Sequence, residues 1–194
     1  MTKLKKKKIK VEVNLTYLNH DLFKKLKYLI DEKKLGSINS FKISWNFVSY
    51  DLNQKIKSWK TDEKQGGGIK NIFLTHIFSY CQFFFGELSV KDIVIKNINF
   101  KGLKFKKQIS FGIIGQKCSN GKVLIGTKER GPQSHKIEIK FENGDVQLFT
   151  KSKDWTKGFV LNINNKKNNK ITNYKSMNNI LFNDGRSQQI YAMI

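Results

Sequence analysis

Several common residue types are nearly missing from this chain of 194 residues. It has one alanine (Ala192), one proline (Pro132) and two arginines (Arg130 and Arg186), so almost all of its 37 basic residues are lysines. Residues whose codons need G or C are scarce, whereas Lys, Asn, Ile and Phe are abundant. This bias indicates a very A+T-rich genome, and part of the lysine excess therefore reflects the genome rather than the function.

Acidic residues are also scarce, and codon bias does not explain that shortage because Asp and Glu have A/T-tolerant codons. The chain has 15 of them against 37 basic residues, which gives a formal net charge of +22. So large a charge repels itself and favours a polyanionic partner, with nucleic acid the first candidate. An enzyme for acidic substrates or a membrane surface is less well supported. Because 39% of residues are hydrophobic and 12% aromatic, the chain has enough apolar residues for a core and is not a disordered histone-like tail.

The sequence also lacks a long hydrophobic run and a disulfide framework. The longest apolar stretch, Asn71 to Phe85, is shorter than the roughly 20 residues that cross a bilayer, so we expect no membrane span. Met1 to Lys10 carries six lysines with no apolar stretch after them, which differs from a signal peptide. Two cysteines, Cys81 and Cys118, are too few for a small secreted disulfide scaffold. These features favour a reducing compartment, or an organelle that encodes the protein.

Hydrophobic periodicity predicts an α+β fold in which two helices pack on a mainly antiparallel sheet. One helix is expected from Leu22 to Leu35, capped by Asn19 or Asp21, and a wider apolar helix from Ile69 to Phe85. The clearest strand has Phe41, Ile43, Trp45 and Phe47 on one face. Further strands are expected at Val11–Leu15, Asp92–Phe100, Leu103–Ile113, Val123–Thr127, Lys136–Phe141, Val146–Thr150 and Phe159–Ile163, with a hairpin turn at Asn143-Gly144.

Composition divides the chain into three parts. We expect a basic N-terminal arm over residues 1–18, an α+β core over 19–161, and a Lys/Asn-rich loop with a C-terminal tail over 162–194. Residues 119–180 are a possible insertion. Gly66-Gly67-Gly68 is interpreted as a flexible connector, because no Walker Lys-Ser/Thr pair follows it and the sequence has no Gly-x-Gly-x-x-Gly motif.

Lysines interleaved with apolar residues form the main candidate binding site. Lys104 and Lys106 would share a strand face opposite Leu103 and Phe105, which anchors the strand and presents a row of ammonium groups. Lysines of this kind act as point charges on phosphates. The predicted RNA-binding residues are Lys5, Lys6, Lys7, Lys8, Lys96, Lys101, Lys104, Lys106, Lys107 and Lys117.

Signs of catalysis and metal binding are weak. His20, His76 and His135 are far apart in sequence, and neither cysteine belongs to a Cys-x-x-Cys motif, so no zinc site is expected. Glu138-Ile139-Lys140 resembles the Glu-x-Lys strand of metal-dependent nucleases, but the second acid that such sites need is missing from Gly131-Pro132-Gln133. We therefore predict no catalytic residue, no metal and no cofactor, and keep the nuclease as an alternative.

Several segments, taken in order, resemble the fifth universal protein of the large ribosomal subunit in its mitochondrially encoded form. Asp21–Tyr28 is similar to that family's first helix, and Ile109–Cys118 to its Ile-Gly-x-Lys strand. Lys96-Asn97-Ile98 is similar to the start of its basic hairpin, and Phe182–Arg186 to its Phe-Asp-Gly-Arg loop. Residues 119–180 match no part of that family.

The resemblance implies a structural, non-enzymatic constituent of a mitochondrial ribosome. Its partners would be ribosomal RNA and neighbouring ribosomal proteins, with no small-molecule substrate, and Arg186 would contact RNA. Encoding in the organelle and the missing import signal place the protein in the mitochondrial matrix. The remaining alternative is a viral capsid protein or nucleoprotein with a basic inner arm.

Overall fold

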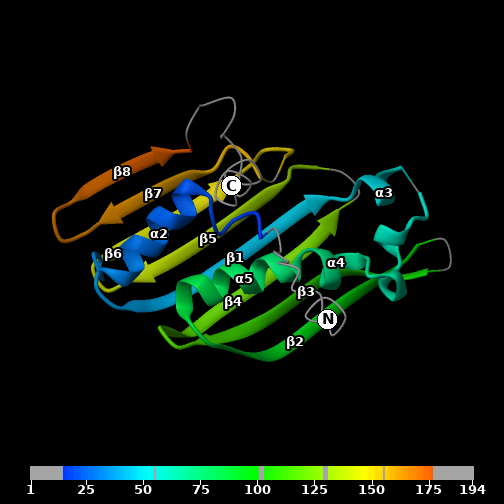
Figure 1. The fold of residues 1–194 in the computed structure, drawn as a ribbon, viewed down its shortest axis with the longest axis horizontal. Coiled ribbons are helices and arrows are strands. Elements are labelled where there is room, and N and C mark those ends of the chain that lie inside the picture. The colour runs from blue at the N-terminus through cyan, green and yellow to red at the C-terminus, as the bar shows by residue number, and fades with distance from the viewer. Residues whose placement is uncertain (1–14, 55, 101–102, 129–130, 155, 177–194) are drawn as a thin grey trace, which may run out of the picture.

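A computed structural model describes residues 15–176 apart from 55, 101–102, 129–130 and 155, and its main feature is a single mixed sheet (Figure 1). Eight strands lie in the order β2-β3-β4-β1-β5-β6-β7-β8. Only β1 and β4 pair in parallel, and every other neighbouring pair is antiparallel. The strands are β1 (Ile38–Val48), β2 (Leu88–Phe100), β3 (Leu103–Gly115), β4 (Cys118–Lys128), β5 (Ser134–Phe141), β6 (Gly144–Thr150), β7 (Val160–Asn165) and β8 (Lys170–Lys175).

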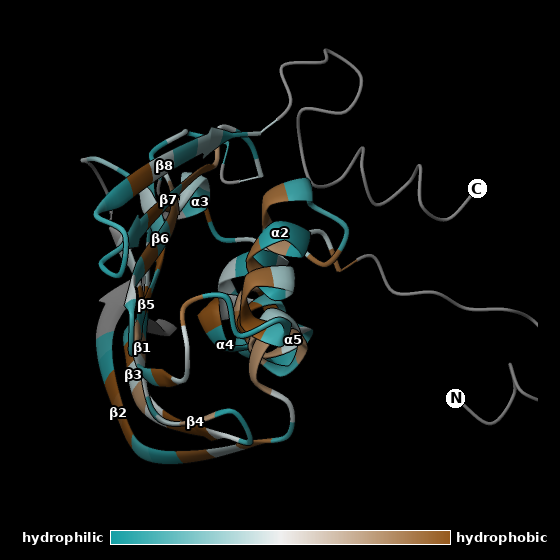
Figure 2. Cartoon of the chain, turned by 90° about the vertical axis from the view of Figure 1, so that its left-hand side faces the viewer, coloured by the Kyte–Doolittle hydropathy of each residue, from teal (hydrophilic) through white to brown (hydrophobic). Residues whose placement is uncertain are grey.

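Helices cover one face of this sheet and leave the other face open. Figure 2 shows α2 (Asp21–Asp31), α4 (Gly68–Ile72) and α5 (Leu74–Phe85) together on one side of the strands. Short helical turns, α3 (Tyr50–Asn53), η1 (Trp59–Thr61) and η2 (Glu63–Gln65), follow β1 at one end of the sheet. We call the two sides the helix face and the open face.

Side-chain alternation explains this two-layer arrangement. In β1 the apolar residues Phe41, Ile43, Trp45 and Phe47 are buried on the helix face, whereas Lys42 lies on the open face and is exposed. Because alternate residues of a strand point to opposite faces, a strand with this pattern must have one face covered. The core therefore lies between the sheet and the helices, and α2 supplies Leu22, Phe23, Leu26 and Ile30 to it.

Most expected elements are present, so the coarse prediction of helices on a mainly antiparallel sheet is confirmed. The hairpin at Asn143-Gly144 is confirmed, since Phe141 pairs with Gly144 across β5 and β6. The apolar helix is interrupted at Phe73, which separates α4 from α5. The N-cap position of α2 is His20 rather than Asn19 or Asp21. The Leu22 N–H donates both to His20 Nδ1 at 3.2 Å and to Oδ1 of Asp21, the first helical residue, at 2.7 Å.

One further local prediction was wrong. The Lys/Asn-rich segment from 162 to 173 is not a loop, because β7 and β8 form an antiparallel hairpin there. Residues 119–176 continue the same sheet as the rest of the core, while the division into arm, core and tail stays a prediction. The expected strand at Val11–Leu15 falls mainly outside the described residues, and in the described part no helix is long and apolar enough to cross a membrane.

Candidate functional site

Two histidines far apart in sequence, His76 and His135, meet on the helix face around the side chain of Tyr17, and His20 joins them through the ring of Phe159. The ring centroid of Tyr17 lies 5.7 Å from that of His76 and 5.3 Å from that of His135, in edge-to-face geometry. The ring of Phe159 contacts both His20 and His135, with ring-centroid distances of 5.1 and 5.6 Å. Tyr17 comes from the turn before α2, His76 from the first turn of α5 and His135 from β5. We call this group the histidine cluster.

His135 is held deep in the cluster by stacking and by one hydrogen bond. Its ring stacks on Trp45 at 4.3 Å, and its Nε2 lies 3.1 Å from the Tyr80 hydroxyl. Burial, with a smaller contribution from nearby His76, lowers the pKa of His135 to about 3, so the imidazole is neutral near pH 7. Burial raises the pKa of Tyr80 well above its usual value, so the phenol keeps its proton and can donate it to Nε2.

His76 is the only histidine of the cluster that is not fully buried. It is half-buried on α5, and burial lowers its pKa below the usual value, which favours the neutral ring at pH 7. A neutral imidazole can accept a proton, and partial exposure lets a ligand reach it. His76 is therefore the best candidate in the described part of the chain for acid–base chemistry.

A pocket of about 340 Å³ opens at the end of the sheet where β1 finishes. Its apolar wall includes Phe47 and Phe73, whose rings stack at 4.0 Å, and its rim includes Trp59 and Tyr50, which are 53% and 68% exposed. Gln133 is fixed beside it, since its Oε1 accepts a hydrogen bond from the Val48 N–H at 3.2 Å. We call this the aromatic pocket, and its volume falls within the range of small-molecule sites.

The aromatic pocket and the histidine cluster are joined through shared rings. Phe73 lines the pocket and also meets Trp45 edge to face at 5.3 Å, and Trp45 stacks on His135. His76 follows Phe73 by three residues, so it lies about one helical turn from the pocket wall. This end of the sheet thus combines a ring-lined hollow with a nearby proton acceptor.

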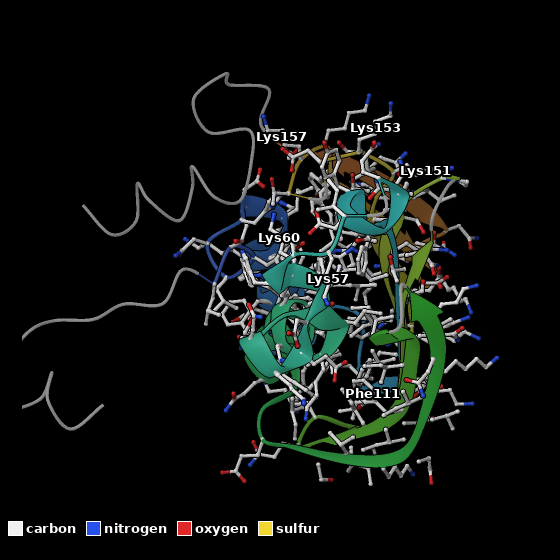
Figure 3. The ribbon with its side chains drawn as sticks, turned by 90° about the vertical axis from the view of Figure 1, so that its right-hand side faces the viewer. Lys57, Lys60, Phe111, Lys151, Lys153 and Lys157 are labelled. Atoms are coloured by element: carbon white, nitrogen blue, oxygen red, sulfur yellow. The ribbon has the colours of Figure 1, made fainter. Side chains whose placement is uncertain are left out.

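Lysines surround this end of the molecule. Figure 3 labels Lys57 and Lys60 from the segment after α3, and Lys151, Lys153 and Lys157 from the connection between β6 and β7. Lys60 and Lys153 line the aromatic pocket, and Asp51 is the acid that lines it with them. Asp51 is buried and accepts a hydrogen bond from the Ser58 hydroxyl, so its charge is already compensated in part. The rim is therefore suited to anionic or strongly polar groups.

The triple glycine is a packed turn rather than the expected flexible connector. Gly66 and Gly68 have φ angles of +86° and +82°, which L side chains rarely adopt. A Cβ on Gly67 would lie 2.1 Å from the Trp59 carbonyl oxygen, so only glycine allows this approach. These glycines place Trp59 against the start of α4, at the aromatic pocket.

The structure describes five of the eleven predicted RNA-binding residues, four of them on the β2–β3 hairpin, and their role stays a prediction. Lys96 and Lys107 are exposed on β2 and β3, and Lys104 and Lys106 belong to β3. Lys117 forms an ion pair with Asp31, and that pair helps to lower the pKa of the Asp31 carboxyl even though burial raises it. Lys5, Lys6, Lys7, Lys8, Lys101 and Arg186 lie outside the described residues.

The nuclease alternative gains no support from the geometry. Glu138 forms an ion pair with Lys136 at 2.8 Å, and Glu138 and Lys140 lie on the open face of β5. Within the described residues no group of three His, Cys, Asp or Glu side chains is arranged to hold a metal ion.

Sequence spacing gave no sign of the histidine cluster, because Tyr17, His76 and His135 come from three separate elements.

Comparison with known proteins identifies the fold. The sequence profile of the GFO/IDH/MocA oxidoreductase family, C-terminal alpha/beta domain, matches residues 27–151. No curated protein sequence matches the chain. Among solved structures, KijD10, a 3-ketoreductase from Actinomadura kijaniata in complex with TDP-benzene and NADP, is similar with 14% identity and a TM-score of 0.67 over 92% of this chain and 50% of its own.

Two further solved structures are similar in the same way. A putative NADPH-dependent oxidoreductase from Desulfitobacterium hafniense has 13% identity and a TM-score of 0.69 over 98% of this chain and 55% of its own. Levoglucosan dehydrogenase in its apo form has 14% identity and a TM-score of 0.68 over 92% and 54%. At these identities the likeness shows the fold, and this chain spans about half the length of each of these proteins.

These findings overturn the functional prediction made from the sequence. The resemblance to a ribosomal protein was wrong, because the pieces that carried it were short, and lysine richness from codon bias made them look alike. The predictions of a non-enzymatic ribosomal constituent, of ribosomal RNA as partner and of no small-molecule substrate were wrong for the same reason. The match covers 125 of the 194 residues, and this chain belongs to the GFO/IDH/MocA oxidoreductase family and contains its C-terminal α/β domain.

Proposed function

We propose that this chain forms the substrate-side domain of a nicotinamide-dependent oxidoreductase that interconverts a hydroxyl and a carbonyl group on a sugar-like substrate. The family match and the names of the similar structures, a 3-ketoreductase and a levoglucosan dehydrogenase, support this class of reaction. The observation that carries the proposal is the half-buried His76, which follows Phe73 in the wall of the aromatic pocket by about one helical turn.

His76 would exchange the proton of the reaction. Oxidation of an alcohol to a ketone removes a hydride and a proton, and a neutral imidazole takes the proton and returns it in the reverse direction. Burial holds the pKa of His76 below its usual value, so the ring is neutral at pH 7. The wall of histidine and tyrosine rings behind it keeps water from the buried side of the imidazole.

The aromatic pocket would hold the substrate ring. Trp59 and Tyr50 offer exposed aromatic faces for the apolar side of a sugar. The Gln133 amide is held by the Val48 N–H and the Lys153 carbonyl, which leaves its second N–H for a substrate hydroxyl. Lys60 and Lys153 favour a substrate with a negatively charged substituent.

The described residues do not fit the dinucleotide itself. A dinucleotide fold needs a parallel sheet with a Gly-rich loop between a strand and a long helix, whereas this sheet is mainly antiparallel. Gly66-Gly67-Gly68 leads into α4, a helix of only five residues. The Trp59 carbonyl oxygen lies against Gly67, so this turn is not a phosphate-binding loop. We therefore propose that the nicotinamide cofactor is held outside the described residues, and we derive no hydride step here. The mitochondrial location stays a prediction.

Two measurements test the proposal. Trp59 fluorescence, with Trp59→Phe as the blank, should change on adding sugars or sugar phosphates to the chain alone. In the complete enzyme with NADPH and a panel of keto-sugars, His76→Gln should lower kcat about 10²- to 10⁴-fold and leave the fluorescence titration unchanged. The control is Gln82→Ala, an exposed site on the same helix. Equal activity of His76→Gln and Gln82→Ala would remove His76 from the reaction.

A further inference from the structure

Two lysines line the aromatic pocket from segments that are far apart in sequence. Lys60 belongs to η1, and Lys153 belongs to the connection between β6 and β7 (Figure 3). Both are exposed, and the rings of Trp59 and Phe47 belong to the same lining. The pocket therefore combines an apolar aromatic surface with two positive charges.

Hydrogen bonds fix the backbone of Lys60 at the pocket. The Ser58 hydroxyl accepts a hydrogen bond from the Lys60 N–H at 3.2 Å and donates one to the Asp51 carboxylate. The Thr61 hydroxyl accepts a hydrogen bond from the Ser58 N–H at 3.2 Å, and these two residues form a capping box. The turn that carries Lys60 is therefore tied to α3 through Asp51.

A second set of hydrogen bonds fixes the segment that carries Lys153. The Lys153 carbonyl oxygen accepts a hydrogen bond from the Gln133 amide at 3.5 Å, and Gln133 Oε1 accepts one from the Val48 N–H at 3.2 Å. The Asp154 N–H donates to the Ser152 hydroxyl at 3.1 Å. Lys153 is therefore held beside the end of β1, where the pocket opens.

Two acids beside these lysines already accept hydrogen bonds from neutral donors. Asp51 accepts the hydroxyl hydrogen bond that ties η1 to α3, and Asp154 accepts from the N–H and the hydroxyl of Thr156 at 3.1 and 2.7 Å. Within the part of the chain that the structure describes, Lys60 and Lys153 form no ion pair. Asp51 also lines the pocket, so two lysines stand against one carboxylate there.

We propose that the aromatic pocket selects a monosaccharide that carries a phosphate or carboxylate group, an inference that rests on the proposed function of this pocket. Lys60 and Lys153 act as point charges on the anionic group of the sugar. A carboxylate accepts more than one hydrogen bond, so Asp51 takes a sugar hydroxyl while the Ser58 hydroxyl still holds it. The exposed ring of Trp59 covers the apolar side of the sugar.

Other ligands fit this pocket less well. A neutral sugar leaves both lysines without an anionic partner, and an amino sugar adds a third cation for which Asp51 is the acid in the lining. The volume of about 340 Å³ is at the lower end of the range of small-molecule sites, which favours a monosaccharide over a larger ligand such as a sugar nucleotide.

The test is titration of the chain with glucose, glucosamine, glucose 6-phosphate and glucuronate, which share a sugar ring and differ in charge. Binding is followed by the fluorescence of Trp59, with Trp59→Phe as the blank. At least one anionic sugar should bind about tenfold more tightly than glucose. Lys60→Gln and Lys153→Gln should each remove about threefold of this preference and leave glucose binding unchanged.

The two anionic probes distinguish the sources of the charge. A preference for glucose 6-phosphate alone would assign the site to a phosphate, and a preference for glucuronate alone to a carboxylate. A preference for both would assign it to the negative charge that they share. Melting temperatures of the variants show that they fold.

Lys57→Gln and Lys151→Gln are the matched controls. Each removes the same charge from the same segment as one pocket lysine, but neither residue lines the pocket. Equal weakening by the controls would overturn the proposal, because it would indicate the general field of a chain with a net charge of +22. Equal affinity for glucose and both anionic sugars, or tightest binding of glucosamine, would also overturn it.

Failure of this inference differs from failure of the proposed reaction. A lysine-dependent preference for an anionic sugar, together with unchanged kcat in His76→Gln, would keep the selectivity of the pocket and remove His76 from the reaction. A large loss of kcat in His76→Gln without any preference for an anionic sugar would keep the reaction and overturn the inference. Absence of binding by all four sugars would overturn the inference as well, whatever the kcat of the variant.

Discussion

Acidification should destabilise this protein through His135 well before its carboxylates titrate. The unfolded chain binds a proton on this histidine near pH 6.5, whereas burial lowers the pKa in the folded state to about 3. Between these values the unfolded state carries more protons, so stability is lost as the pH falls below about 6.5. From pH 7.5 to pH 5.0 the loss is about 1.5 pH units at 1.36 kcal/mol each, or about 2 kcal/mol.

His76 acts in the same direction, because burial also lowers its pKa. The other ionisable groups at the cluster are His20, Tyr17, Tyr80 and Cys81, and burial raises the pKa values of the Tyr80 phenol and the Cys81 thiol well above this range. The Asp31 carboxyl has a lowered pKa and contributes only below about pH 4. The pH window from 7.5 to 5.0 therefore isolates the histidines.

The assay is urea unfolding followed by circular dichroism at pH 7.5 and pH 5.0, on the wild type and on His135→Phe. The phenyl ring keeps the stack on Trp45 and cannot bind a proton, so the variant should lose about 2 kcal/mol less than the wild type between the two pH values. Its lower stability at both pH values does not affect this difference. An equal pH-dependent loss in both proteins would refute the assignment of a buried, neutral His135.

Two further substitutions test the packing around the site. Tyr80→Phe should lower the free energy of unfolding by about 1–3 kcal/mol, because it leaves the His135 Nε2 buried without the hydroxyl 3.1 Å away, and urea unfolding measures the loss. An unchanged midpoint would mean that this hydrogen bond is not formed. Gly67→Ala should cost about 1–3 kcal/mol, since its Cβ would meet the Trp59 carbonyl oxygen at 2.1 Å. The matched control is Gly126→Ala, whose nearest neighbour is 3.4 Å away, and a similar melting temperature for the two variants would contradict the close approach.

Local sequence patterns predicted the positions of the strands better than they predicted which strands pair. The alternation from Phe41 to Phe47 identified β1, and Asn143-Gly144 identified the β5–β6 hairpin, because both signals depend on neighbouring residues alone. Nothing local distinguishes a parallel partner from an antiparallel one, so the pairing of β1 with β4 was not predicted. The low-complexity segment hid β7 and β8, since Asn and Lys have low strand propensity and their pairing comes from tertiary context.

The site was missed for a related reason. Its members, Tyr17, His76 and His135, are brought together only when two helices cover the sheet, and a spacing rule applied along the chain cannot detect them. The number of lysines, by contrast, led to a site that the comparisons do not support. A strong compositional signal was assigned to a single partner, ribosomal RNA, although the lysines are distributed over many strands and loops.

The parallel pairing of β1 with β4 has a consequence for how the chain acquires its structure. Phe41 pairs with Gly121, so β1 waits for 80 further residues before its partner on that side is available. Until then β1 has no neighbouring strand on that side, although α5, which covers its apolar residues, has already been synthesised. Contacts of such long sequence separation slow folding and leave an aggregation-prone strand exposed during synthesis. A nascent chain of this protein should therefore depend on holding chaperones until β4 has left the ribosome.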